Sequence, residues 1–133
     1  MNSGAFAARF GLSGMPVEAE WIGASRDVML AESTGCRLVL DQVSTARTLE
    51  IVAAARARGA KVHATVAAHT LFFNERDVGD YLTYCKVNPP FRDEDTRQGL
   101  IAALKRGEID AVVSAHDPQP PEEKRLPFGE AAF

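Results

Sequence analysis

The sequence predicts an α/β fold made of about four parallel βα units. Gly35, Gly59 and Gly107 each follow a segment of helical character, and a short apolar, β-branched run begins within a few residues of each glycine. Glycine is favoured directly after a helix because it adopts the left-handed conformation without a steric penalty. The repeated order of strand, polar tip, helix and glycine is typical of βα units joined by right-handed crossovers.

Length and composition limit how large this fold is. The chain has 133 residues, of which 46% are apolar and 25% charged, and we expect a single domain covering residues 1–133. A closed barrel of eight βα units needs roughly 250 residues, so a complete barrel is excluded. The last segment, 119–133, contains Pro120, Pro121 and Pro127 and is expected to be an extended surface loop.

The charge balance and the two cysteines exclude several classes of partner. The net charge of −3 and the lack of a basic run argue against binding to nucleic acid or to an anionic membrane. The longest mostly apolar run, 62–73, is too short to cross a bilayer, and we identify no signal peptide. Cys36 and Cys85 lie far apart without a CxxC motif, so we expect reduced core residues in a cytoplasmic protein.

Each predicted element has its own local signal. Residues 1–16 have the glycine content of a loop, and Pro16 occupies the place favoured at a helix start. Ser44 and Asp93 are expected to cap two further helices by accepting a hydrogen bond from a free backbone N–H group. The expected elements are helix 17–33, strand 37–42, helix 45–58, strand 61–66, loop 67–70, strand 84–87, helix 94–106 and strand 109–114.

Polar residues stand at or just after the carboxyl ends of the predicted strands. In parallel α/β sheets these ends meet at one edge, where ligands bind and catalytic side chains lie. The polar residues are Asp41, Gln42, His69, Asn88, His116 and Asp117, and Ala115 stands among them. We therefore expect them to converge on one face of the protein.

Two interpretations of these polar ends remain open. A hydrolytic metal site needs at least three His, Asp or Glu ligands around one ion, and the candidates are His69, His116, Asp41 and Asp117. The alternative is that these groups only cap helices and fix loops, because the sequence has no HxH pair and no glutamate at a strand end. His63, in the middle of a predicted strand, is expected to be a half-buried structural or helix-facing residue rather than a ligand.

Several runs of sequence carry a family resemblance through their order and spacing. They are Gly11-Leu12-Ser13-Gly14-Met15-Pro16, Gln42-Val43-Ser44-Thr45-Ala46, Lys86-Val87-Asn88-Pro89-Pro90-Phe91-Arg92, Gly107-Glu108-Ile109-Asp110-Ala111, and Pro121-Glu122-Glu123-Lys124 with Leu126-Pro127-Phe128. Together they resemble the dihydroorotase branch of the amidohydrolase superfamily over the whole chain. The resemblance implies a partial (β/α)8 TIM barrel, about its second half, from the loop after the fourth strand through the eighth strand.

The positions that this family uses for metal binding and catalysis are changed here. The metal-binding histidine of the family's MHEG motif falls on Asn2, and that of its HVST motif falls on Gln42. The catalytic and metal-binding aspartate of its TDHAPH motif falls on Ala115, and the substrate-contacting histidine that ends this motif falls on Gln119. The family's HxH pair and bridging acid have no counterpart in this chain. The resemblance therefore implies no catalytic residue and no intact metal site.

Other motif positions are kept. Asn88 matches the substrate-binding asparagine of the family's NPP motif, and with Gln119 it would form a vestigial substrate-binding pair. His69 and His116 match histidines of the TPHH and TDHAPH motifs that are not direct metal ligands, and Asp117 follows at the same strand tip.

These replacements favour the interpretation that the protein has no catalytic activity. Asparagine and glutamine are weak, neutral ligands for zinc, and alanine neither binds metal nor moves a proton. The pattern resembles the pseudo-dihydroorotases, which implies a structural role beside aspartate carbamoyltransferase in pyrimidine biosynthesis, with no cofactor. The alternative is a fragment of a zinc-dependent dihydroorotase, which interconverts N-carbamoyl-aspartate and dihydroorotate. A truncated gene product without an independent role is the third possibility.

A partial barrel also leaves two sheet edges open. We expect these edges at 37–42 and 109–114. Unpaired backbone groups on an apolar edge recruit other strands, so a stable species must cover them. Either of two partners would cover these edges: a second copy of this chain or the remainder of a longer chain. The side chains expected to face inward are Val39, Val62 or Ala64, Val87 and Val112.

Overall fold

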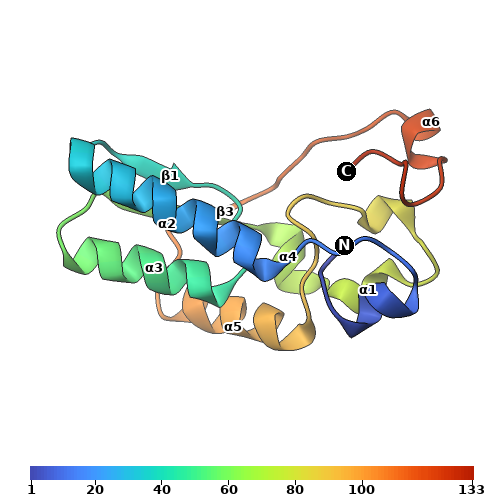
Figure 1. Cartoon of the computed structure of the whole chain (residues 1–133), viewed down its shortest axis with the longest axis horizontal. Coiled ribbons are helices and arrows are strands. Elements are labelled where there is room, and N and C mark those ends of the chain that lie inside the picture. Colours follow the sequence, from blue (N-terminus) through green and yellow to red (C-terminus); the bar gives the residue numbers. More distant parts are fainter.

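The computed structural model describes all 133 residues and confirms an α/β fold with one small parallel sheet. Three long helices, α2 (Val17–Thr34), α3 (Ala46–Ala57) and α5 (Glu94–Lys105), lie side by side in Figure 1 and share one core with the sheet. The strands are β1 (Leu38–Leu40), β2 (Val62–Ala67) and β3 (Ala111–Val113). The short elements are α1 (Ala5–Arg9), α4 (Ala68–Phe72), α6 (Pro121–Lys124) and the 3₁₀ helices η1 (Glu75–Val78) and η2 (Thr83–Cys85).

The sheet has the order β1-β2-β3, and both pairs of neighbours are parallel. Leu38 pairs with Val62, and Thr65 pairs with Ala111. Each crossover between parallel strands passes through a helix, as the alternating pattern predicted. Because β2 lies in the centre, β1 and β3 each keep one unpaired edge.

The predicted strand at residues 84–87 is wrong. Thr83–Cys85 form the 3₁₀ helix η2, and the following residues are irregular. Pro89 and Pro90 carry no backbone N–H group and cannot extend a ladder. The Lys86 ammonium donates hydrogen bonds to two carbonyls of the C-terminal tail, at 3.1 and 2.6 Å, so this segment is held away from the sheet. The sheet therefore has three strands rather than about four.

The glycines that ended the predicted helices have the expected conformation. The φ angles of Gly35, Gly59 and Gly107 are 69°, 91° and 74°. Any other residue type would be strained there, which explains why each helix stops at its glycine.

One of the two predicted helix caps is displaced by a residue. Asp93 caps α5, accepting a hydrogen bond from the Thr96 amide at 2.8 Å. For α3 the cap is Thr45, whose hydroxyl accepts from the Thr48 amide at 3.3 Å, and not Ser44. The Ser44 side chain is engaged in a different set of hydrogen bonds, described below.

Two segments expected as loops contain short helices. Residues 67–70 enter α4, whose first turn is fixed by the Thr70 hydroxyl donating to the carbonyl of Ala67 at 2.8 Å. The segment 119–133 is not extended throughout, because it forms α6 and buries Phe128. Both helices are too short to give a periodic signal in the sequence.

The two faces of the sheet differ in what covers them. Val62, Ala64 and Val66 are fully buried in a core of eleven residues that also contains side chains of α2, α3 and α5. Their neighbours on the opposite face are open: Val39 is 54% exposed, and His63, which pairs with it, is also exposed. The expectation that Val62 or Ala64 faces inward is therefore wrong. Of the two alternatives for His63, the helix-facing one is wrong, whereas its half-exposed ring contacts Asp110 at 3.0 Å, as expected of a structural residue.

None of the helices combines the length and the apolar character needed to cross a membrane. The longest, α2, begins with two acidic residues in its first turn, Glu18 and Glu20.

Candidate functional site

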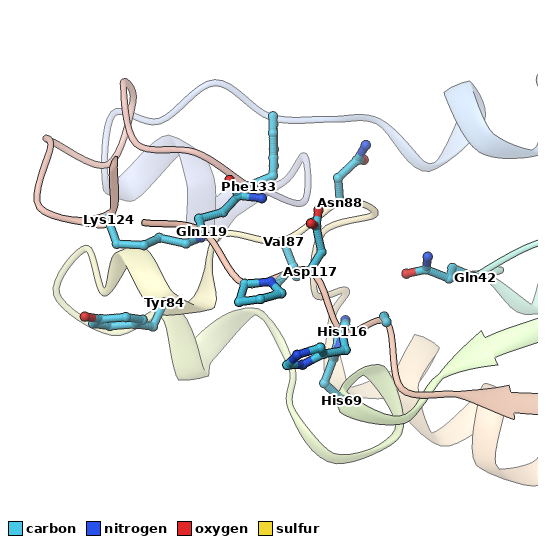
Figure 2. A pocket seen from close by; sticks show the side chains of 12 residues that line it. Gln42, His69, Tyr84, Val87, Asn88, His116, Asp117, Gln119, Lys124 and Phe133 are labelled. Atoms are coloured by element: carbon cyan, nitrogen blue, oxygen red, sulfur yellow. The ribbon is translucent and has the colours of Figure 1, made fainter. Parts of the chain in front are cut away.

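A cavity of about 610 Å³ lies at the carboxyl ends of the strands. Figure 2 shows Gln42 on one side of this cavity, Tyr84 and Lys124 on the opposite side, and the histidines between them. We call it the strand-tip cavity. Its lining residues are Gln42, His69, Tyr84, Val87, Asn88, Ala115, His116, Asp117, Pro118, Gln119, Lys124 and Phe133. The expected convergence is thus observed for all the residues predicted at the strand ends except Asp41.

Two of the strand tips turn into the cavity through left-handed residues. Gln42 has φ 55° and Ala115 has φ 48°, which are unusual values for residues other than glycine. The turn at Gln42 is fixed by a hydrogen bond to the neighbouring strand, because the Gln42 backbone amide donates to the Thr65 hydroxyl at 2.9 Å. The same hydroxyl donates to the Asp41 carboxylate, so Asp41 stabilises the turn and does not line the cavity. For Asp41 the loop-fixing interpretation describes what the structure shows.

His69 is a titratable side chain of the cavity whose pKa is shifted by its surroundings. Its ring meets the ring of Phe91 edge to face, with centroids 5.4 Å apart. Burial lowers the pKa of His69, so the imidazole is neutral at pH 7. Its Nε2 atom is buried and has no hydrogen-bond partner within the chain. A neutral imidazole with a free ring nitrogen is able to donate or accept one hydrogen bond.

Asn88 enters the cavity from the irregular segment between η2 and α5. Its side chain is exposed, and the peptide bond between Asn88 and Pro89 is cis. Gln42, on the facing side, makes only a long contact of 3.4 Å with the Asp41 carboxylate. These amide groups therefore face the cavity with most of their hydrogen-bonding capacity unused.

The residues of this chain do not fit a zinc site. No three His, Cys, Asp or Glu side chains lie close enough together to hold a metal ion. Gln42 offers a neutral amide and Ala115 a methyl group, neither of which suits zinc. Asn2 lies outside the strand-tip cavity, and its Oδ1 accepts from the Arg92 guanidinium at 3.1 Å. A cation bound at that oxygen would meet the positive charge of Arg92.

A buried polar network behind the cavity was missed by the sequence analysis. Its centre is Arg92, which is only 4% exposed. The guanidinium donates to Ser44 Oγ at 2.9 Å, to Asn2 Oδ1 at 3.1 Å and to the Met15 carbonyl at 3.0 Å. Burial lowers the pKa of Arg92, although the nearby Glu20 carboxylate opposes this, and the arginine stays charged.

Glu20 is the other half of this network. Its carboxylate lies 3.6 Å from the guanidinium and accepts hydrogen bonds from the Ser44 and Thr45 amides, each at 3.1 Å. The hydroxyls of Ser44, Thr45 and Thr48 also donate to it. We call the six residues Asn2, Glu20, Ser44, Thr45, Thr48 and Arg92 the Arg92 network. In the sequence, three members of the network stand inside motifs that resemble the family. Ser44 and Thr45 belong to the run that begins at Gln42, and Arg92 ends the run that begins at Lys86.

The C-terminal tail closes one wall of the cavity. The Lys124 ammonium donates to the carbonyls of Thr83, Lys86 and Ala132, at 3.4, 3.3 and 3.0 Å. Burial lowers the pKa of Lys124, and the nearby positive charge of Lys86 adds to this effect. The tail thereby brings to the cavity Gln119, which the family resemblance placed beside Asn88, and Phe133, which the expectation of an extended loop did not predict.

Comparisons with known proteins agree with this geometry. No protein-family model matches the chain. Dihydroorotases from Thermoanaerobacter sp. (strain X514) and Leifsonia xyli subsp. xyli are 38% and 42% identical to it, each over the whole chain. The L-hydantoinase (dihydropyrimidinase) from Arthrobacter aurescens covers 90% of the chain with a TM-score of 0.81 at 30% identity. A dihydroorotase from Campylobacter jejuni has a TM-score of 0.61 at 17% identity, which shows the fold alone.

The chain spans about three tenths of the length of the relatives that it matches, 31% and 30% for the two dihydroorotases. Of the L-hydantoinase it covers 26%. These likenesses support the amidohydrolase superfamily that the motifs indicated, and they concern one segment of much longer proteins.

Proposed function

We propose that this chain is a dihydroorotase-like protein of pyrimidine biosynthesis that does not catalyse the reaction itself. Its role would be structural, in an assembly with aspartate carbamoyltransferase. The observation that carries the proposal is the content of the strand-tip cavity: Gln42 and Ala115 stand where a metalloenzyme needs ligands and a proton-transfer group.

The Arg92 network supports this proposal because it keeps the site's walls in place without an ion. It joins the N-terminal segment at Asn2, helix α2 at Glu20 and the tip of β1 at Ser44. Asn88 lies four residues before Arg92 on the same segment. The network thus fixes the segments that carry Gln42 and Asn88, two lining residues of the cavity, by hydrogen bonds within the protein.

A rescue experiment tests the loss of catalysis. Restoring Gln42→His and Ala115→Asp together should give at most weak zinc binding, because the remaining ligands are still missing from this chain. Zinc is measured by elemental analysis of the dialysed protein, and ring closure of N-carbamoyl-aspartate is measured in parallel. Gln42→Ala with Ala115→Ser is the matched control. Stoichiometric zinc with ring closure in the unmodified protein would contradict the proposal.

The assembly role needs a separate measurement. The protein is mixed with aspartate carbamoyltransferase from the same organism, and the mass of the mixture is followed by light scattering during gel filtration. A joint species that raises the thermal stability of the carbamoyltransferase is expected. Two separate peaks at micromolar concentrations, together with an unchanged melting temperature, would contradict a structural role beside this enzyme.

The second candidate is a segment of a zinc-dependent dihydroorotase whose other ligands come from elsewhere. The observation that favours it is the neutral His69, whose free Nε2 belongs to the same cavity that His116 and Asp117 line. A zinc signal lost in His69→Gln, but kept in His63→Gln, would favour this candidate. His63 is the control because it lies outside the cavity.

A further inference from the structure

The C-terminal tail, residues 119–133, supplies one wall of the strand-tip cavity, and an irregular connection joins it to the sheet. Figure 1 shows that the chain crosses from β3 to α6 without forming a helix or a strand. No backbone hydrogen bond joins residues 114–118 to another part of the chain. The tail is therefore held in place by its own contacts and not by the connection that precedes it.

Two lysines hold the tail by contacts that run in both directions. Lys86, on the segment after η2, donates to the tail carbonyls of Gly129 and Ala131 at 3.1 and 2.6 Å. Lys124, on the tail, donates to the carbonyls of Thr83 and Lys86 at 3.4 and 3.3 Å. We call these contacts the lysine latch. A charged donor bonds a carbonyl more strongly than a neutral one does, so the latch depends on both ammonium charges.

The charges of the lysine latch are held by carbonyl oxygens and an aromatic ring. No lysine of the chain forms an ion pair with a carboxylate. The Lys86 ammonium lies 5.0 Å from the centroid of the Phe133 ring, which is a favourable contact for a cation. Burial lowers the pKa of Lys124, and the positive charge of Lys86 lowers it further. Removing either charge would therefore weaken several contacts of the tail at once.

The remaining contacts of the tail are separate from the main core. Phe128 is its apolar anchor, 7% exposed, in a small cluster with Val78 and Phe91. The helix α6 has only four residues and is too short to persist without tertiary contacts. The core that joins the sheet to α2, α3 and α5 contains no residue of the tail. The tail is therefore able to leave the cavity without disturbing that core.

We infer that the C-terminal tail is a gate of the strand-tip cavity, and that the lysine latch keeps this gate closed. The gate supplies Gln119, Lys124 and Phe133 to the lining. His69 and Gln42 come from α4 and from the turn after β1, and they stay in place. Opening widens the cavity toward solvent and exposes His69 Nε2, which is buried in the closed state. The gate acts in this way whether or not the cavity catalyses a reaction.

The latch is tested by removing both of its charges. Lys86→Gln with Lys124→Gln replaces each ammonium by a neutral amide. The matched control is Lys61→Gln with Lys105→Gln, which makes the same change of charge on two exposed lysines. Hydrogen/deuterium exchange of the full chain is followed by mass spectrometry. Exchange in residues 119–133 should become about tenfold faster in the latch variant and stay unchanged in the control, whereas exchange in β2 should be the same in all proteins.

The gate is tested by the reactivity of His69. Diethyl pyrocarbonate acylates neutral imidazole nitrogens that solvent reaches, and peptide mass spectrometry gives the rate at each histidine in one sample. His69 should react about tenfold faster in the latch variant than in wild type, because its Nε2 becomes accessible when the tail leaves. His63 is the internal control, since it is exposed and lies outside the cavity, and its rate should not change.

The outcomes are distinct. Faster exchange of the tail together with faster acylation of His69 supports the gate. Unchanged exchange of the tail overturns it, because the latch would not hold the tail, and an unchanged His69 rate overturns it, because the tail would not control access. Exchange that rises equally in β2 also overturns it, since the two lysines would then stabilise the whole fold. If circular dichroism shows that the double variant is unfolded, Lys86→Gln and Lys124→Gln alone decide by the same criteria.

Discussion

The Arg92 network and the strand-tip cavity are neighbouring polar clusters that differ in how completely their hydrogen bonds are made. In the network, the Arg92 guanidinium and the Glu20 carboxylate are surrounded by donors and acceptors of the protein. In the cavity, His69 Nε2 lacks a partner, and the Asn88 side chain is exposed. The walls of the site are therefore stabilised independently of whatever the cavity binds.

This contrast has an energetic reason. A buried polar group without a partner costs about 1–3 kcal/mol, so a buried network is stable only when nearly every group is satisfied. In the open cavity only His69 Nε2 bears this cost, whereas an exposed side chain such as that of Asn88 reaches solvent and avoids it. Substitutions in the network should therefore change the free energy of unfolding, whereas those in the cavity should change ligand binding alone.

Arg92→Met is expected to have the largest effect on stability. Removing one partner of a buried ion pair leaves the other charge uncompensated, at a cost of about 3–5 kcal/mol. Here Glu20 would keep its charge beside Ser44 and Thr45 without the guanidinium. Urea denaturation followed by circular dichroism measures the change. Arg47→Met is the control, because Arg47 pairs with Glu50 on the surface and should contribute less than about 1 kcal/mol.

A double variant sharpens this prediction. If the cost of Arg92→Met arises from the uncompensated carboxylate, adding Glu20→Gln should recover part of it. The single and double variants are compared in one thermodynamic cycle. Effects that simply add would mean that the two side chains stabilise the fold separately, and that the cluster is not one network.

A substitution of Asp110, at the opposite end of the sheet, is expected to have an intermediate effect on the free energy of unfolding, and this effect depends on pH. Asp110 ties the amino end of β3 to its neighbours through Arg56, His63 and the Ala64 amide, the last at 2.7 Å. Partial burial would raise the pKa of Asp110, but these hydrogen bonds outweigh it and lower the pKa. Since the folded pKa is depressed, the stabilisation is complete above the unfolded value of about 3.9 and is lost as the pH falls through the folded value.

Asp110→Asn should therefore lower the free energy of unfolding by about 1–2 kcal/mol at neutral pH. The difference between wild type and variant should shrink below about pH 4, where the wild-type carboxyl becomes protonated. Thermal melts in a series of buffers measure it. Asp95→Asn, in the first turn of α5, is a surface control. A difference that grows as the pH falls would show that the carboxylate does not stabilise the sheet.

The fold was predictable where a local signal coincided with the tertiary structure. The glycines after α2, α3 and α5 end those helices because a left-handed residue is needed there, and this requirement is visible in the sequence. The segment 84–87 has the composition of a strand, yet it forms η2 beside the C-terminal tail. That outcome depends on a contact between residues far apart in sequence, which composition does not encode.

The candidate site was predictable in part for the same reason. The positions of Gln42, His69 and Ala115 follow from the rule that parallel strands end on one side. Asn88 also lines the cavity, although the strand expected before it does not form. Glu20 was not predicted, because its acceptance of bonds from Ser44 and Thr48 becomes apparent only when α2 packs on α3. A carboxylate on an amphipathic helix has the same sequence signature whether it faces water or a buried hydroxyl.

Asn88→Ala is expected to have the smallest effect on stability. The Asn88 side chain is exposed and belongs to the cavity rather than to the network, so the change in the free energy of unfolding should lie within about 0.5 kcal/mol.

The variant becomes informative when dihydroorotate or N-carbamoyl-aspartate is added during a thermal melt, because a ligand that binds the folded state raises the melting temperature. If the cavity keeps only its shape, neither compound shifts the wild type or the variant. A shift in wild type that Asn88→Ala abolishes, while Asn74→Ala leaves it unchanged, would show that the amide still binds a ligand. The cavity would then not be passive, and the contrast between it and the stabilising network would be wrong in that respect.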